Sequence, residues 1–247
     1  MENQVTKPKF PTEMVDLPSK GLLYPEGSPL KSGQVEMKYM TAREEDILTN
    51  QNYIQQGTVL DKLIESLIVS KIDIKELLVV DKNAILIASR ILGYGQDYEF
   101  ENRGTVYKVD LTKMMDKELP SDVNYENGNN FEFILPASKN QITFKLLTHG
   151  DEMSLDQELK GLKKINPNGS PELSTRLKYI ITSVNGDTDR KTIREFVDNE
   201  LLARDSRALR QEIKRISPDI DLTIKSDDGE DIAVPISLNF FWPDLNL

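Results

Sequence analysis

An internal similarity constrains the fold of this chain more than any other feature of its sequence. The segment VEMKYMTAREEDIL (35–48) aligns without gaps on ITFKLLTHGDEMSL (142–155). Both segments alternate apolar and polar residues and then place a threonine before a helical pattern, so each predicts a strand followed by a capped helix. Identical residues occupy four aligned pairs of positions: Lys38 and Lys145, Thr41 and Thr148, Glu45 and Glu152, Leu48 and Leu155. The alignment predicts two copies of one structural unit.

A second, shorter similarity follows in each half. The pattern D-x-x-A-I at 81–85 matches D-x-x-A-L at 205–209, and hairpin patterns follow at 98–111 and 222–236. The predicted order in each half is a strand, a capped helix, a longer helix, an Asp-capped helix and a hairpin. Coincidence is the alternative explanation, because a strand followed by a capped helix is common.

Proline and loop residues divide the chain into three parts. Five of the 12 prolines fall in residues 1–33, where they favour extended backbone. The polar stretch DVNYENGNN (122–130) predicts a loop between domains. We therefore expect an α+β fold with an extended N-terminal arm at 1–33. Two related strand–helix–hairpin lobes should follow, at 34–121 and 131–247.

Composition excludes several classes of function. The chain has 31 Lys and Arg against 41 Asp and Glu, a net charge of −10, which disfavours binding to nucleic-acid phosphates. It has no cysteine, so disulfides, thiolate nucleophiles and Cys-ligated metals are excluded. No apolar run approaches the roughly 18 residues that a membrane span needs. We expect a soluble cytoplasmic protein with no cofactor and no stable membrane insertion.

Candidates for catalysis are few. His149, the only histidine, follows a predicted cap and is expected to face water. Several carboxylates fall in predicted first helical turns: Glu44, Glu45, Asp46, Asp151 and Glu152. The helix dipole stabilises negative charge there, so capping is expected rather than a glycosidase-like acid pair. Residues 227–231 (DDGED) predict a hairpin turn rather than a calcium loop. No catalytic or metal-binding residue is predicted.

One predicted helix carries a basic face. Arg207, Arg210 and Lys214 share a side of the helix that begins near Asp205. Two explanations stay open: the face is simply solvated, or it binds an acidic partner.

Apolar side chains near both ends are the predicted contact residues. The N-terminal set is Leu17, Leu22, Leu23 and Tyr24, and the C-terminal set is Phe240, Phe241 and Trp242. Aromatic and aliphatic side chains of this kind anchor protein interfaces. For the C-terminal set, packing on the second lobe's own core is the alternative.

Several of these segments resemble one protein family. LPSKGLLYP (17–25), followed by a glycine-bearing turn and VEMKYMTAREEDIL (35–48), resembles the start of the baseplate hub proteins of T-even-type contractile-tail bacteriophages. DKNAILIASRILGYGQDYEF (81–100) and FFWPDL (240–245) resemble the family's Asp-capped helix and its aromatic end. Relatives carry paired cysteines in the hairpin after the Tyr-Gly element; this chain has none at 99–104, so strand pairing and packing must hold that hairpin.

The resemblance implies a non-enzymatic role in building the tail baseplate hub through contacts with other hub proteins. It leaves open whether the protein is a structural component of the virion or an assembly chaperone confined to the host cytoplasm. The alternative function is a cell-wall glycan hydrolase, because baseplate hubs can carry such an activity.

Overall fold

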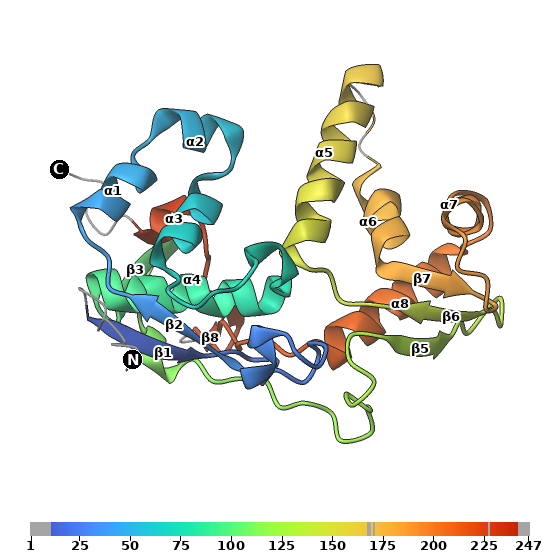
Figure 1. Cartoon of the computed structure of the whole chain (residues 1–247), viewed down its shortest axis with the longest axis horizontal. Helices are drawn as coiled ribbons and strands as arrows, with labels where there is room; N and C mark the ends of the chain where they lie inside the picture. Colours follow the sequence, from blue (N-terminus) through green and yellow to red (C-terminus); the bar gives the residue numbers. More distant parts are fainter. Residues whose placement is uncertain (1–10, 167–168, 170, 227, 242–247) are drawn as a thin grey trace, which may run out of the picture.

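The computed structural model describes residues 11–166, 169, 171–226 and 228–241. It confirms the α+β class, with helices and small antiparallel sheets (Figure 1). The α-helices are α1 (Ala42–Leu48), α2 (Gln51–Gln56), α3 (Val59–Leu67), α4 (Val79–Tyr94), α5 (His149–Ile165), α6 (Glu172–Ile180), α7 (Arg190–Asn199) and α8 (Ala203–Ile216). The strands are β1 (Thr12–Asp16), β2 (Gln34–Lys38), β3 (Asp97–Asn102), β4 (Thr105–Asp110), β5 (Phe131–Ile134), β6 (Gln141–Phe144), β7 (Ile181–Val184), β8 (Thr223–Lys225) and β9 (Asp231–Ala233).

The first lobe contains the N-terminal segment that was predicted as a separate arm. Strand β1 pairs antiparallel with β2, with Thr12 opposite Lys38. Beyond the strand, the Leu17 amide donates to the Gly33 carbonyl oxygen at 2.8 Å. The described part of the predicted arm at 1–33 therefore belongs to the first lobe. Four of its apolar residues belong to the hydrophobic core: Leu17, Leu23, Tyr24 and Leu30.

The second lobe is built on the sheet β5-β6-β7. Helices α6 and α7 pack against each other and against β7, and α5 packs on α6 (Figure 1). Helix α6 ends at Ile180 and β7 begins at the next residue, Ile181. Residues 181–184 form the third strand because Ile142 of β6 pairs with Val184.

The C-terminal segment leaves the second lobe and returns to the first. After α8, Ile220 forms a β-bridge with Asp116. Further on, the Arg90 side chain of α4 donates to the Phe240 carbonyl oxygen at 3.0 Å. In Figure 1 this red segment lies among the blue and green elements of the first lobe. The predicted boundary 131–247 is therefore corrected: the second lobe ends with α8, because the closing apolar residues cover the first lobe.

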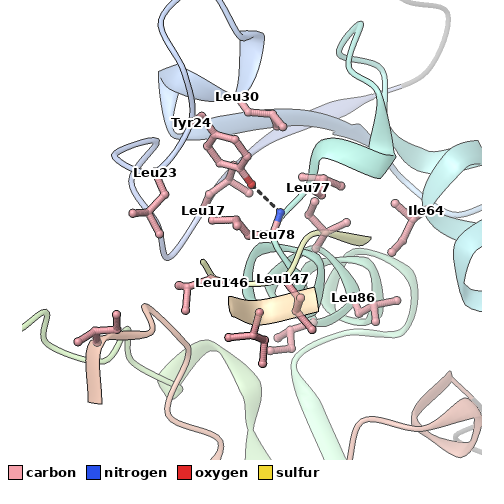
Figure 2. Close-up of a cluster of buried hydrophobic side chains, with 14 of the residues drawn as sticks. Leu17, Leu23, Tyr24, Leu30, Ile64, Leu77, Leu78, Leu86, Leu146 and Leu147 are labelled. Atoms are coloured by element: carbon pink, nitrogen blue, oxygen red, sulfur yellow. Dashed lines mark hydrogen bonds between the residues drawn. The ribbon is translucent and has the colours of Figure 1, made fainter. Parts of the chain in front are cut away.

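Backbone hydrogen bonds join the two lobes. The Val79 amide donates to the Leu147 carbonyl oxygen at 3.0 Å, and the His149 amide donates to the Leu77 carbonyl oxygen at 2.7 Å. Leucines from both lobes pack around this junction in one continuous hydrophobic core (Figure 2). Among the described helices, none is long and apolar enough to cross a membrane.

Candidate functional site

The N-terminal side chains predicted to bind a partner lie mostly inside the monomer. Leu17, Leu23 and Tyr24 are buried, and Figure 2 shows them packed at the start of α4. Only Leu22 keeps a substantial exposed fraction, 38%. The first three are therefore core residues rather than contact residues, because burying them in their own lobe already removes their apolar surface from water. Partner binding by Leu22 stays a prediction.

The C-terminal aromatic residues are buried as well. Phe240 and Phe241 are 1% and 0% exposed, and the Phe240 ring meets Tyr98 edge-on with centroids 4.8 Å apart. The prediction that these two rings anchor a partner is wrong. They pack on a core, as the alternative held, but on that of the first lobe rather than the second. Trp242, the third predicted contact residue, lies outside the described residues.

A buried carboxylate fixes the N-terminal turn. Asp81 accepts hydrogen bonds from the Ser19 amide at 3.0 Å, the Ser19 hydroxyl at 2.7 Å and the Tyr24 hydroxyl at 2.6 Å. The Tyr24 hydroxyl also accepts from the Leu78 amide at 2.9 Å (Figure 2). Burial raises the pKa of the Asp81 carboxyl, although the Tyr24 and Ser19 donors oppose the shift. Asp81 is closed to solvent, so it supports the fold and cannot meet a substrate.

The second lobe repeats this arrangement. Asp205 is the third residue of α8, as Asp81 is of α4. It accepts from the Ala137 amide at 2.7 Å and the Ser138 amide at 2.9 Å. Burial would raise the pKa of the Asp205 carboxyl, but these amide donors lower it. Each lobe therefore uses an aspartate near a helix start to hold a turn between two strands.

The two turns also share sequence and backbone conformation. LPSK (17–20) lies between β1 and β2, and LPASK (135–139) lies between β5 and β6. Lys20 and Lys139 both adopt positive φ angles, 51° and 62°, a region that few non-glycine residues enter. An internal duplication predicts such parallels, and we propose that the two lobes arose by one.

The aligned strand–helix segments contain equivalent ion pairs. Lys38 Nζ lies 2.8 Å from the Glu44 carboxylate, and Lys145 Nζ lies 2.8 Å from the Asp151 carboxylate. Each acid is the third helical residue and completes a capping box with its threonine. The expected capping role of these two carboxylates is confirmed.

Glu44 is the more strongly held of the two acids. Burial would raise its pKa, but hydrogen bonds from Lys38, Ser66 and Thr41 lower the pKa of Glu44 to about 2. The side chain is fully buried. A carboxylate that stays ionised at neutral pH and is closed to solvent suits a structural role.

His149 does not face water as expected. It is only 4% exposed, because α3 and α4 of the first lobe pack over the start of α5. Lys82 Nζ lies 3.1 Å from Nδ1, and an Asp61 carboxylate oxygen lies 3.5 Å from Nε2. Burial lowers the pKa of His149, and the neighbouring Lys82 ammonium lowers it further. The ring is therefore neutral at pH 7, with Nδ1 accepting from the ammonium.

An open cleft between the lobes lies beside this imidazole. It has a volume of about 320 Å³ near α4 and continues into a hollow of about 460 Å³ between α2 and α5. Its walls carry Asp61, Glu152 and Asp156. Asp61 pairs with Lys82, and Glu152 pairs with Arg176. Across the described residues, no three potential metal ligands cluster.

A more apolar groove lies between α6 and α8. Its first hollow, about 340 Å³, has mainly aliphatic walls: Leu173, Leu177, Val197, Leu201 and Ala203. Its second hollow, about 230 Å³, is lined by Val79, Leu146, Leu147, Ile180 and Ile213, and also by Lys145 and the Glu152–Arg176 ion pair. Ser206 lines the first hollow, and Arg210, one turn later on α8, lines the second. The hollows therefore follow each other along α8, and we refer to them together as the α6–α8 groove.

The cations of the predicted basic face border this groove. Arg207, Arg210 and Lys214 are exposed, and the Arg210 guanidinium bonds back to the Ser206 carbonyl oxygen at 3.3 Å. Within the part of the chain that the structure describes, no carboxylate lies within 4.0 Å of these three cations. Arg215, by contrast, is paired with two acids. The groove thus combines hollows whose aliphatic walls are mostly buried or half-buried side chains, with Leu173 exposed at the first hollow, and unpaired positive charge alongside.

Comparison of the chain with protein-family models, with curated proteins and with solved structures finds no match. The resemblance to baseplate hub proteins therefore depends on the sequence segments alone.

Sequence patterns identified the basic face but missed the groove beside it. Leu173, Leu177 and Ile180 recur at helical spacing, which predicts an apolar helix face. The pattern does not reveal that α8 leaves part of this face uncovered. The burial of His149 left no local signal either, because residues from the other lobe cause it.

Proposed function

We propose that the protein helps to build the tail baseplate hub of a contractile-tail bacteriophage, and that it acts by binding other hub proteins. The resemblance at 17–25, 35–48 and 81–100 supports the phage assignment. The α6–α8 groove is the observation that supports action by contact. Apolar hollows with the exposed Leu173 at one of them, and unpaired cations alongside, are typical of a binding site.

The resembling residues have structural roles in this chain. The turn at 17–25 is held by Asp81, and the segment 35–48 contains the buried Lys38–Glu44 pair. The resemblance therefore points to a shared fold, and the contact surface must be sought elsewhere on the molecule.

Co-expression tests this function. The full chain, carrying an affinity tag, would be produced together with the baseplate proteins of a T-even-type phage. A stoichiometric complex with a hub protein, retained through size-exclusion chromatography, is the expected result. If every baseplate protein elutes separately from the chain, the proposal is wrong.

Mass spectrometry separates the two versions of the proposal. A structural component occurs at fixed copy number in purified virions and also in infected-cell lysate. An assembly chaperone acting in the host cytoplasm occurs in the lysate alone.

One observation favours glycan hydrolysis as a second candidate: the inter-lobe cleft is open and carries three carboxylates. Hydrolysis requires a proton-donating acid beside a second carboxylate. Two of the three acids are held in ion pairs, an arrangement that suits structural support. Zymography on peptidoglycan tests the activity. A cleared zone that disappears in Asp156→Asn would favour the hydrolase.

A further inference from the structure

We propose that the α6–α8 groove binds an acidic amphipathic helix from a partner protein. Two apolar side chains of this helix would fill the two hollows, and a carboxylate between them would pair with Arg210. The inference rests on the proposed function, since it names the surface and the kind of partner through which the protein acts.

The spacing of the hollows matches a helix. On α8 the first hollow is lined by Ala203 and Ser206, and the second by Arg210, Ile213 and Ser217. At 1.5 Å per residue, the midpoints of these two sets of α8 residues lie about 13 Å apart along the helix axis. Side chains seven or eight residues apart on a helix are separated by about 10.5–12 Å along its axis. A helix lying along α8 can therefore place one apolar side chain in each hollow.

The positive charge beside the α6–α8 groove favours an acidic segment as its partner. Arg207, Arg210 and Lys214 follow the outer edge of α8, and they lack carboxylate partners within the described residues. The chain as a whole has a net charge of −10 and would repel an acidic helix. The attraction must therefore come from these three neighbouring cations. Arg210 lines the end of the second hollow that is nearer to the first, where its guanidinium can form a bidentate pair of hydrogen bonds with a carboxylate.

The shape and polarity of the groove disfavour two other occupants. A nucleic acid would pair its phosphates with the cations but would leave the aliphatic hollows unfilled. A second copy of this chain would bring another ten net negative charges to the contact. The test below gives each of these occupants a distinct outcome.

The experiment measures binding of a designed probe to the full chain by fluorescence anisotropy. The probe is a labelled helical peptide of about 18 residues. It carries two leucines that lie two turns apart, with glutamates between and beside them. We expect saturable binding that weakens at least about tenfold in Arg210→Glu. Replacing both leucines of the probe by alanine should weaken binding by a similar factor.

Two further variants keep the test specific. Arg204→Glu makes the same change of charge on α8 but on a side turned away from the groove, so binding should change by less than about twofold. Ala203 is exposed and lines the first hollow, so Ala203→Trp should fill that hollow from the surface and prevent the probe from binding there. Its far-UV circular dichroism and thermal midpoint should match those of the parent chain.

Four results would overturn the inference. The first is no binding at about 1 mM probe, and the second is equal weakening by Arg204→Glu and Arg210→Glu. The third is tight binding of a single-stranded DNA oligonucleotide that competes with the probe. The fourth is self-association, detected by sedimentation, that Arg210→Glu abolishes while the probe fails to bind.

The two proposals can fail separately. If co-expressed hub proteins bind the parent chain and Arg210→Glu equally well, the groove inference fails while the proposed function stands. If the probe binds as expected but no hub protein does, the groove binds acidic helices and the phage assignment fails.

Discussion

Removing the Tyr24 hydroxyl is a direct test of the buried network that fixes the N-terminal turn. In Tyr24→Phe, Asp81 loses a donor at 2.6 Å and the Leu78 amide loses its acceptor at 2.9 Å. All of these atoms are buried, so water cannot replace the lost partner. Each buried group left without a partner costs about 1–3 kcal/mol. Asp81 keeps both bonds from Ser19, so we expect a total loss of about 2–4 kcal/mol.

Urea unfolding of the full chain at pH 7, followed by circular dichroism and by intrinsic fluorescence, measures this change. The two transitions must coincide before a free energy of unfolding is derived. Tyr107→Phe is the matched control, because the Tyr107 hydroxyl has no hydrogen-bond partner among the described residues. Its free energy of unfolding should lie within about 0.5 kcal/mol of the parent value. If Tyr24→Phe also stays within that range, the network does not hold the turn.

Three further predictions concern other buried groups. Because the folded pKa of His149 is lowered, the unfolded chain takes up a proton first as the pH falls below about 6.5, so stability should drop there. In His149→Gln, a plot of unfolding free energy against pH should be flatter below about pH 6.5 than in the parent chain. An unchanged slope would refute the claim that His149 is buried in its neutral form. Glu44→Gln should lower the free energy of unfolding, measured in urea at pH 7, by about 2–4 kcal/mol. The control Glu45→Gln changes an exposed residue and should lower it by less than about 0.5 kcal/mol. Equal losses would contradict the assignment of a buried Lys38–Glu44 pair. The Glu44 contribution should be lost as the pH falls from about 4.5 towards 2. Phe240→Ala should cost about 3–5 kcal/mol, and a cost below about 1 would mean that the C-terminal segment does not pack on the first lobe.

Local features of the fold could be predicted from the sequence. The capping threonines Thr41 and Thr148 begin helices as expected, because a capping box is formed by residues close in the chain. The hairpin around Arg103 was also predicted, and β3 pairs with β4 there. These elements depend on residues within a few positions of each other, so the local sequence pattern is sufficient to predict them.

Features that depend on distant residues were predicted poorly. The segment ITSV (181–184) fits either a buried helix end or a strand by periodicity alone, and pairing with β6 decides for the strand. The apolar residues at 17–24 and 240–241 could either bind a partner protein or pack inside the monomer, and only the folded structure decides between these roles. An apolar side chain carries the same signal in both situations, so the sequence could not distinguish them.

The candidate site also has one part that local sequence predicts and another part that depends on distant residues. The row of Arg207, Arg210 and Lys214 follows from helical spacing, and we predicted it as either a solvated face or a partner surface. The hollows beside it depend on how the side chains of α6 and α8 lie against each other. Several distant contacts of the second lobe set that arrangement, and no motif encodes it.

Site-specific photo-crosslinking is the most direct test of the claim that the protein acts through the α6–α8 groove. A photoreactive amino acid would replace Leu173, which lines the first hollow and is 47% exposed. In a control chain it would replace Val106, which is 59% exposed on the first lobe. Both chains would be co-expressed with the baseplate proteins and irradiated, and the products sequenced by mass spectrometry. We expect position 173 alone to be joined to an acidic amphipathic segment of a hub protein. Equal products from both positions, or none from position 173, would contradict the account.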